Sequence, residues 1–293
     1  MKRAIGGTAL LLAVLAAGWA GAAALRGEHA SAALGDANAC AAYNGLPAGW
    51  GQSPDAGMVR VTTTTGRAFR IDATEVTRAQ FAAFVDATGY RTQAERGGDV
   101  ALFEQLAPDA PDISPQAWWR HSRTANWKQA GTRSDHEPVT LVTRADAQAY
   151  ALWLGHRLPT EAEWEAAAHG ARELDDRGKA AANFWQGFFP IDDRAEDGHH
   201  GLAPVGCYRA NAQGLYDSIG NVWEWTADDW SGSAQAHGHG AIPGAQASTT
   251  GVIKGGSWLC AANYCQRYRD NARHPQDAAL ATVHVGFRTV RDE

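Results

Sequence analysis

Cys260 and Cys265 are the residues of this sequence whose type and spacing are best suited to chemistry, and they stand in the stretch GGSWLCAANYC. Five positions apart, they would point about 140° apart on a helix and to opposite faces of a strand. Their thiols therefore converge only if the chain turns between them. Two converging thiols make a disulfide, a redox pair or a site for a soft metal such as Cu(I). The spacing differs from the C-x-x-C of thioredoxin-like proteins, and zinc would need further ligands.

The first 33 residues have the pattern of an export segment. Lys2 and Arg3 precede an almost wholly apolar run from Thr8 to Leu25, and the small residues of 30–32 suit a signal peptidase. We therefore predict a signal peptide over 1–33, or an uncleaved anchor that would attach the chain to a membrane. Both alternatives place the protein outside the cytoplasm, in the periplasm or beyond. In such a compartment four cysteines favour disulfides, including one between Cys260 and Cys265.

The composition is that of a globular protein that does not bind nucleic acid. The net charge is −6 over 293 residues, whereas binding to phosphates needs clustered Lys and Arg. Twelve tryptophans predict a core of large rings in short segments. No internal repeat or interdomain linker is evident, and we expect a monomer.

Helices are predicted where a threonine cap precedes an apolar stripe. Thr77, Thr143 and Thr160 each stand three residues before a Gln, Asp or Glu, which is the capping-box spacing. Gly89 and Gly155 are expected to end the first two helices. A hairpin is predicted from strands 59–63 and 68–71, and short strands from 251–254 and 285–290. We expect irregular chain in the lead-in at 34–57, in 91–136 and through most of the chain after 183.

The stretch GGSWLCAANYCQRYRDNAR, followed by HVGFR, resembles the signature of the aerobic formylglycine-generating enzymes, also called sulfatase-modifying factors. The resemblance extends upstream through DATEVTRAQFAAFV and NFWQGFFP, while RLPTEAEWE and GNVWEW mark the broader superfamily, which includes iron-dependent sulfoxide synthases and binding modules. The resemblance covers roughly residues 58–291. It implies one C-type-lectin-like α+β domain over 58–293, with little regular secondary structure.

The resemblance also implies a reaction. Members of the family use O₂ to oxidise a cysteine in a C-x-P-x-R segment of an unfolded sulfatase to Cα-formylglycine. Cys260 and Cys265 match the ligands of a Cu(I) ion that the substrate thiol joins. Ser257 and Trp223 match residues near the oxygen pocket, although a turn hydroxyl and core packing are the plain alternatives. The other functions considered are an exported oxidase of another thiol or small molecule, and a binding module with a Cys260–Cys265 disulfide.

Two calcium sites are implied in the same way. Without the resemblance, the acids concerned would be solvated loop residues as readily as ligands. The first site matches Asn183, Phe184, Asp197 and His199, and the second matches Asp217, Gly220, Val222 and Glu224.

Several residues remain after these assignments. Ala151, Asp270 and Thr289 stand where some exported relatives have cysteines, so Cys40 and Cys207 are expected to pair with each other. His237 and His239 lie in a Gly/Ala/Ser-rich stretch and are interpreted as a flexible loop. Candidates for substrate contacts are Asp277, His284, Arg267 and Arg269, with ion pairing inside the domain as the alternative.

Overall fold

The three longer helices begin at threonine caps. The computed structural model describes residues 34–132, 134–231, 249–265 and 269–293. Capping boxes at Thr77, Thr143 and Thr160 open α3 (Arg78–Thr88), α5 (Arg144–Leu154) and α6 (Glu161–Ala168). Gly89 and Gly155 close the first two in the left-handed region, at φ 66° and 75°. The predicted starts and ends are confirmed, because a cap satisfies backbone groups that helix ends leave unpaired.

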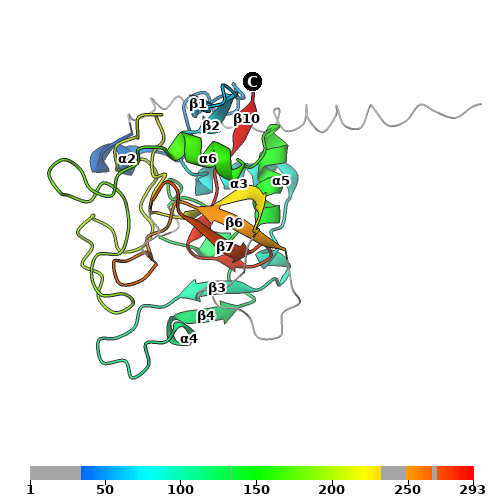
Figure 1. Ribbon diagram of the computed structural model, residues 1–293. Helices are drawn as coiled ribbons and strands as arrows, with labels where there is room; N and C mark the ends of the chain where they lie inside the picture. Colours follow the sequence, from blue (N-terminus) through cyan, green and yellow to red (C-terminus); the bar gives the residue numbers. More distant parts are fainter. Residues whose placement is uncertain (1–33, 133, 232–248, 266–268) are drawn as a thin grey trace, which may run out of the picture.

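Ten short strands form three sheets among the described residues. In Figure 1 the β1-β2-β10 sheet lies at the top, β6 and β7 in the middle, and β3 and β4 at the bottom. The sheet orders are β1-β2-β10, β4-β3-β8 and β7-β6-β5-β9. The strands are β1 (Met58–Thr62), β2 (Ala68–Asp72), β3 (Val100–Phe103), β4 (Trp119–Ser122), β5 (Trp223–Asp229), β6 (Thr250–Lys254), β7 (Arg273–Asp277), β8 (Ala281–Thr282), β9 (Val285–Gly286) and β10 (Val290–Asp292).

The β1–β2 hairpin and strand β6 confirm the predicted strands, but other segments are more regular than expected. The supposedly irregular 91–136 contains β3, β4 and three short helices, and 34–57 contains another. Residues 285–290 form two strands in different sheets. Elements of two to six residues are too short to leave a clear period in the sequence. The short helices are α2 (Ala37–Ala42), η1 (Ala94–Arg96), α4 (Pro115–Trp118) and η2 (Trp127–Gln129).

Aromatic rings form the main core between α3, α5 and β5. Phe81 stacks on Tyr150 at 5.9 Å, and Phe287 meets both rings edge-on. Trp223 and Trp225 of β5 are fully buried in the same cluster. The predicted core of large rings is confirmed, and its β5 side carries the residues of the candidate site.

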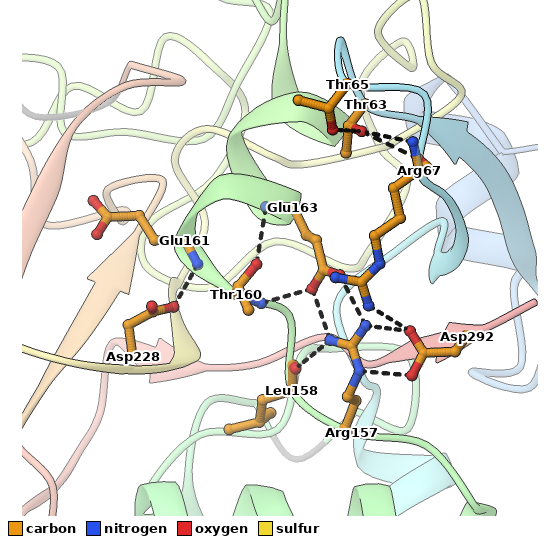
Figure 2. Close-up of polar contacts among 10 residues, drawn as sticks. All are labelled: Thr63, Thr65, Arg67, Arg157, Leu158, Thr160, Glu161, Glu163, Asp228 and Asp292. Atoms are coloured by element: carbon orange, nitrogen blue, oxygen red, sulfur yellow. Dashed lines mark hydrogen bonds and ion pairs between the residues drawn. The ribbon is translucent and has the colours of Figure 1, made fainter.

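The C-terminal strand is tied to the start of α6 by charged side chains. Arg157 donates to Glu163 at 2.7 and 2.8 Å and to Asp292 at 2.6 and 3.2 Å, and Arg67 contacts both acids (Figure 2). Arg67 and Asp292 are more than half exposed, so screening by water keeps the net contribution of these pairs small.

A disulfide between Cys40 and Cys207 secures the lead-in segment, as expected from the sequence. Their Cα atoms are 4.9 Å apart, and the bond closes a separation of 167 residues. It joins α2 to the long irregular region that precedes β5. Across the described ranges, no helix is long and apolar enough to cross a membrane.

Candidate active site

Cys260 and Cys265 meet because the chain makes a tight turn between them. The amide of Ala261 donates to the Tyr264 carbonyl at 2.7 Å, and the Tyr264 amide donates back at 3.1 Å. Cys265 adopts φ 76°, a left-handed conformation that is unusual for a residue with a Cβ atom. The two Cα atoms are 5.0 Å apart and the sulfurs are in direct contact. The turn that convergence requires is therefore present.

Ser257 and Trp223 lie beside this pair. The Ser257 carbonyl accepts the Cys260 amide at 2.9 Å, and its hydroxyl accepts the Leu259 amide at 3.3 Å. Ser257 thus has the turn role that was one of its alternatives. Trp223 is buried in the same apolar cluster as Cys260, so its packing role is also present. Its indole Nε1 is buried without a hydrogen-bond partner in the described part of the chain. The structure thus brings all four sequence-derived residues together.

Aromatic side chains surround the cysteine turn. Tyr264 stacks on Phe189 with ring centroids 4.4 Å apart and an interplanar angle of 7°. Trp118 and Phe103 contact Phe189, and Trp185 meets it edge-on at 5.1 Å. Cys260 is only 1% exposed. The surroundings are thus apolar and exclude most water from one of the two sulfurs.

The first predicted calcium set is drawn together around Asp197. The Asp197 carboxylate accepts the amides of Phe184 at 3.0 Å and His199 at 2.9 Å, while Asn183 is buried next in sequence to Phe184. Gln186 Nε2 donates both to this carboxylate, at 2.8 Å, and to the Phe184 carbonyl. Burial raises the pKa of Asp197. Two oxygens of the set therefore converge on one position, which the Gln186 amide occupies.

The second predicted calcium set lies on the loop before β5, and its two carboxylates differ in how readily they could bind a cation. Asp217 accepts the Gly206 amide at 2.5 Å through one oxygen, and its other oxygen is buried with no partner among the described residues. Both Glu224 oxygens are already bound, by Arg288 at 2.7 Å each and by the Trp164 indole at 2.7 Å. Asp217 is thus available to a cation, whereas Glu224 is engaged.

The two predicted calcium sets are in contact through the turn that leads into Trp223. The Asn221 amide donates to the Asn183 carbonyl at 2.8 Å. Gly220, at φ 77°, passes so close to Asn183 that a Cβ atom would collide with that same carbonyl. Val222 follows and is buried. No group of three His, Cys, Asp or Glu side chains in the described ranges could hold a metal, so calcium here would need amide and backbone oxygens beside a single carboxylate.

Sequence reasoning missed Glu75 and Arg288, which form a buried charge cluster with Asp217 and Glu224. Glu75 accepts the Asn221 side-chain amide at 2.9 Å and is fully buried. Its pKa is raised well above its ordinary value by burial and then by the charges of Asp217 and Glu224. Burial also raises the pKa of Asp217 to about 7. Glu75 and Arg288 lie in DATEVT and HVGFR, but nothing in those stretches marks them as buried charges.

The three described candidates for substrate contacts have separate surroundings. His284 is buried, with its ring 5.2 Å from that of Trp119. Asp277 ends β7 and caps the amide of Ala279 at 2.8 Å. Arg269 is exposed and lies 3.8 Å from Glu173, which is the ion pairing considered as its alternative. Arg267, His237 and His239 lie outside the described residues.

Comparison with known proteins agrees with this architecture. Residues 43–293 match the sulfatase-modifying factor enzyme 1-like domain. A formylglycine-generating enzyme of Streptomyces coelicolor is 44% identical over 260 residues, which cover 82% of this chain and 83% of that protein. Its counterpart in Thermomonospora curvata is 43% identical over 270 residues, with coverages of 83% and 89%.

A solved structure, that of PvdO from Pseudomonas aeruginosa, superposes with a TM-score of 0.53 at 23% identity, over 84% of this chain and 88% of PvdO. At that identity the likeness concerns the fold alone. It agrees with the expected mixture of helices and small sheets with much irregular chain. On the domain match and the two bacterial relatives together, this chain belongs to the sulfatase-modifying factor family, the family of the formylglycine-generating enzymes.

Proposed function

We propose that this protein is an exported oxidase that converts the cysteine of a C-x-P-x-R segment in an unfolded sulfatase to Cα-formylglycine, using O₂ and Cu(I). The observation that carries the proposal is the buried contact of Cys260 with Cys265, beside Trp223 and Ser257. The relatives named formylglycine-generating enzyme support the same reaction.

The residues present fit Cu(I). Two cysteine sulfurs converge in apolar surroundings, and thiolate sulfur is the soft ligand that Cu(I) prefers. When bound, the ion would supply the activation of O₂. Cys260 and Cys265 would hold it, and the aromatic surroundings would keep bulk water away from the reacting thiol. Trp223 has a buried N–H with no acceptor in the described ranges, which suits it to shape or hydrogen-bond an oxygen pocket.

The oxidation of the substrate cysteine fixes how many electrons must come from elsewhere. Converting a thiol-bearing carbon to an aldehyde, with release of the sulfur as sulfide, removes two electrons from the cysteine. Full reduction of O₂ to water takes two more, which an external thiol can supply as it forms its disulfide. The proposed reaction therefore requires a reductant as well as O₂.

The proposal includes two structural calcium ions. The first set, Asn183, Phe184, Asp197 and His199, would fit if the Gln186 amide left the position where the Asp197 and Phe184 oxygens converge. Asp217 of the second set also fits, because one of its buried oxygens has no partner among the described residues. Gly220 and Val222 would add carbonyls there, whereas Glu224 would have to share its oxygens with Arg288. Calcium at either place would brace the loop that carries Trp223.

An exported location is supported by the Cys40–Cys207 disulfide, since such bonds persist in oxidising compartments. Residues 1–33 would supply the signal or an anchor. A sulfatase threaded out unfolded would present its cysteine in that compartment.

The test is direct conversion of a peptide. The reduced protein is incubated with Cu(I), O₂, a thiol reductant and a C-x-P-x-R peptide, and the peptide mass is followed. We expect conversion of the thiol to an aldehyde, and its loss in Cys260→Ser and in Cys265→Ser. A peptide with alanine in place of the arginine is the matched control for substrate recognition. Absence of the aldehyde with copper-loaded protein would refute the proposed reaction.

A second candidate follows from the contact of the two sulfurs, which is also what a permanent disulfide requires. In that case the protein would be a non-catalytic binding module. Thiol titration of the native protein under mild reduction separates the two. The oxidase exposes two titratable thiols and takes up one Cu(I), whereas the module exposes no thiol and takes up no copper. A copper-binding protein inactive on the peptide would favour an oxidase of another thiol or a small molecule.

A further inference from the structure

Asn263 lies between the two cysteines in the sequence, and its side-chain amide forms two hydrogen bonds with the backbone of one residue, Phe189. Its Oδ1 accepts the Phe189 amide at 3.1 Å, and its Nδ2 donates to the Phe189 carbonyl at 2.9 Å. The residue is otherwise exposed to solvent. An exposed asparagine can satisfy its amide with water, so this paired geometry fixes the turn to the segment that contains Phe189.

The segment 185–189 holds the cysteine turn at two places. The Trp185 amide donates to the Cys260 carbonyl at 3.1 Å, and Asn263 anchors the chain two residues before Cys265. Both cysteines are therefore anchored to the same backbone segment, 185–189. That piece is itself held, because the Trp185 indole donates to the Asp192 carbonyl at 2.8 Å.

Cys265 needs such support because of its backbone conformation. At φ 76° the backbone of a residue with a Cβ atom is strained. Such a conformation persists only where contacts with the surrounding structure hold it in place. The amide–carbonyl pair inside the turn joins Ala261 to Tyr264, whose ring stacks on that of Phe189. Asn263 adds hydrogen bonds from the turn to the backbone of the same residue.

We propose that Asn263 is a positioning residue that holds the Cys260 and Cys265 sulfurs together through its paired hydrogen bonds to Phe189. The proposal rests on the proposed function where it concerns Cu(I). It also has a metal-free consequence, because two sulfurs held together favour disulfide over dithiol. Asn263 itself need not touch copper, O₂ or substrate.

The experiment measures two equilibria in the full chain. The first is the Cu(I) affinity of the reduced protein, by competition with a chromophoric Cu(I) chelator. The second is the metal-free dithiol–disulfide equilibrium of the pair in glutathione buffers. There the two protein thiols form a disulfide as one glutathione disulfide becomes two thiols. Asn263→Ala removes the amide, and Asn263→Leu removes it while keeping most of the volume.

We expect each variant to bind Cu(I) about tenfold more weakly, a loss of about 1.4 kcal/mol. We also expect a shift of about tenfold toward the dithiol, or about 30 mV. Asn271→Ala is the matched control, an exposed asparagine of the same region, and it should change neither quantity. Retained near-ultraviolet circular dichroism would show that the fold is intact.

The proposal is overturned if both Asn263 variants stay within about twofold of the parent in both equilibria. It is also overturned if Asn271→Ala has the same effect, because the shift would then not depend on the bonds to Phe189. A parent protein that fails to bind Cu(I) would refute the proposed function instead. The glutathione equilibrium would still decide the role of Asn263 in that case.

Discussion

Replacing Arg288 by methionine should destabilise the protein far more than losing an exposed arginine does. Arg288 is fully buried and binds both oxygens of Glu224 at 2.7 Å. It also donates to the carbonyls of Asp72, Ala73 and Tyr216 at 3.0 to 3.3 Å. Methionine would keep part of the volume and none of these bonds. A buried carboxylate would then face the other acids of the cluster without its cation.

Removal of one member of a buried ion pair costs about 3–5 kcal/mol, because the remaining charge stays uncompensated. We therefore expect Arg288→Met to lower the free energy of unfolding by about 4 kcal/mol. In urea this corresponds to a midpoint lower by about 1 to 2 M. Arg120→Met is the matched control, because the side chains of Arg120 and its partner Glu104 are both more than half exposed. We expect a loss below about 1 kcal/mol there.

The assay is urea unfolding followed by tryptophan fluorescence, with disulfides intact and EDTA present. Adding Glu224→Gln to Arg288→Met should restore part of the loss, because the unpaired charge is removed. Calcium should also restore part of it, since Glu224 would then be free to bind the ion. The reasoning is refuted if Arg288→Met and Arg120→Met cost the same, or if the double variant is no more stable than Arg288→Met alone.

Three further predictions concern the disulfide, the acid cluster and Trp223. Cys40→Ser opens a closed loop of 167 residues and should lower the free energy of unfolding by about 5 kcal/mol in denaturant titrations; a loss under about 1 kcal/mol would contradict the expected constraint on the unfolded chain. Because burial raises the pKa of Asp217 to about 7, its folded form retains a proton that the unfolded form releases near pH 4, so stability in EDTA should fall as pH rises from about 4 to about 7. Calcium or Asp217→Asn should flatten that dependence, and an unchanged slope in Asp217→Asn would assign it elsewhere. Trp223→Phe keeps a six-membered aromatic ring but removes the indole N–H that has no partner among the described residues. Peptide conversion should then fall about tenfold with the Cu(I) affinity unchanged, and full activity would rule out a role for that N–H.

Local signals in the sequence predicted the helices well. Each of the three caps pairs a threonine with a Gln, Asp or Glu three residues later, and the bonds involved span one turn of chain. The hairpin at 58–72 was predictable for the same reason. Strands β3, β4, β5 and β7 to β10 were missed or misplaced because they are stabilised by distant partners, and all but β5 are short. β3, for example, pairs with β8, which lies 181 residues further along the chain.

For the candidate site, residue types and motif resemblance selected Cys260, Cys265, Ser257 and Trp223, and the fold brings these residues together. The sequence offered no sign that Asn263 would bond to Phe189, which lies 74 positions away in an irregular segment. It also offered no sign that Glu75 would lie behind the site. Side chains on loops acquire partners through packing rather than through any periodic pattern.

The sequence by itself determined the starts of the three longer helices, the aromatic core, the family and the identity of the central thiols, because these depend on residue type and on contacts close along the chain. Only the tertiary structure decided that Cys260 and Cys265 share one anchoring segment, that Gln186 lies between two candidate calcium ligands, and that Glu75, Asp217 and Glu224 surround Arg288. The physical reason is that the electrostatic and hydrogen-bonding environment of a buried group is set by residues that are distant in sequence and adjacent only after folding.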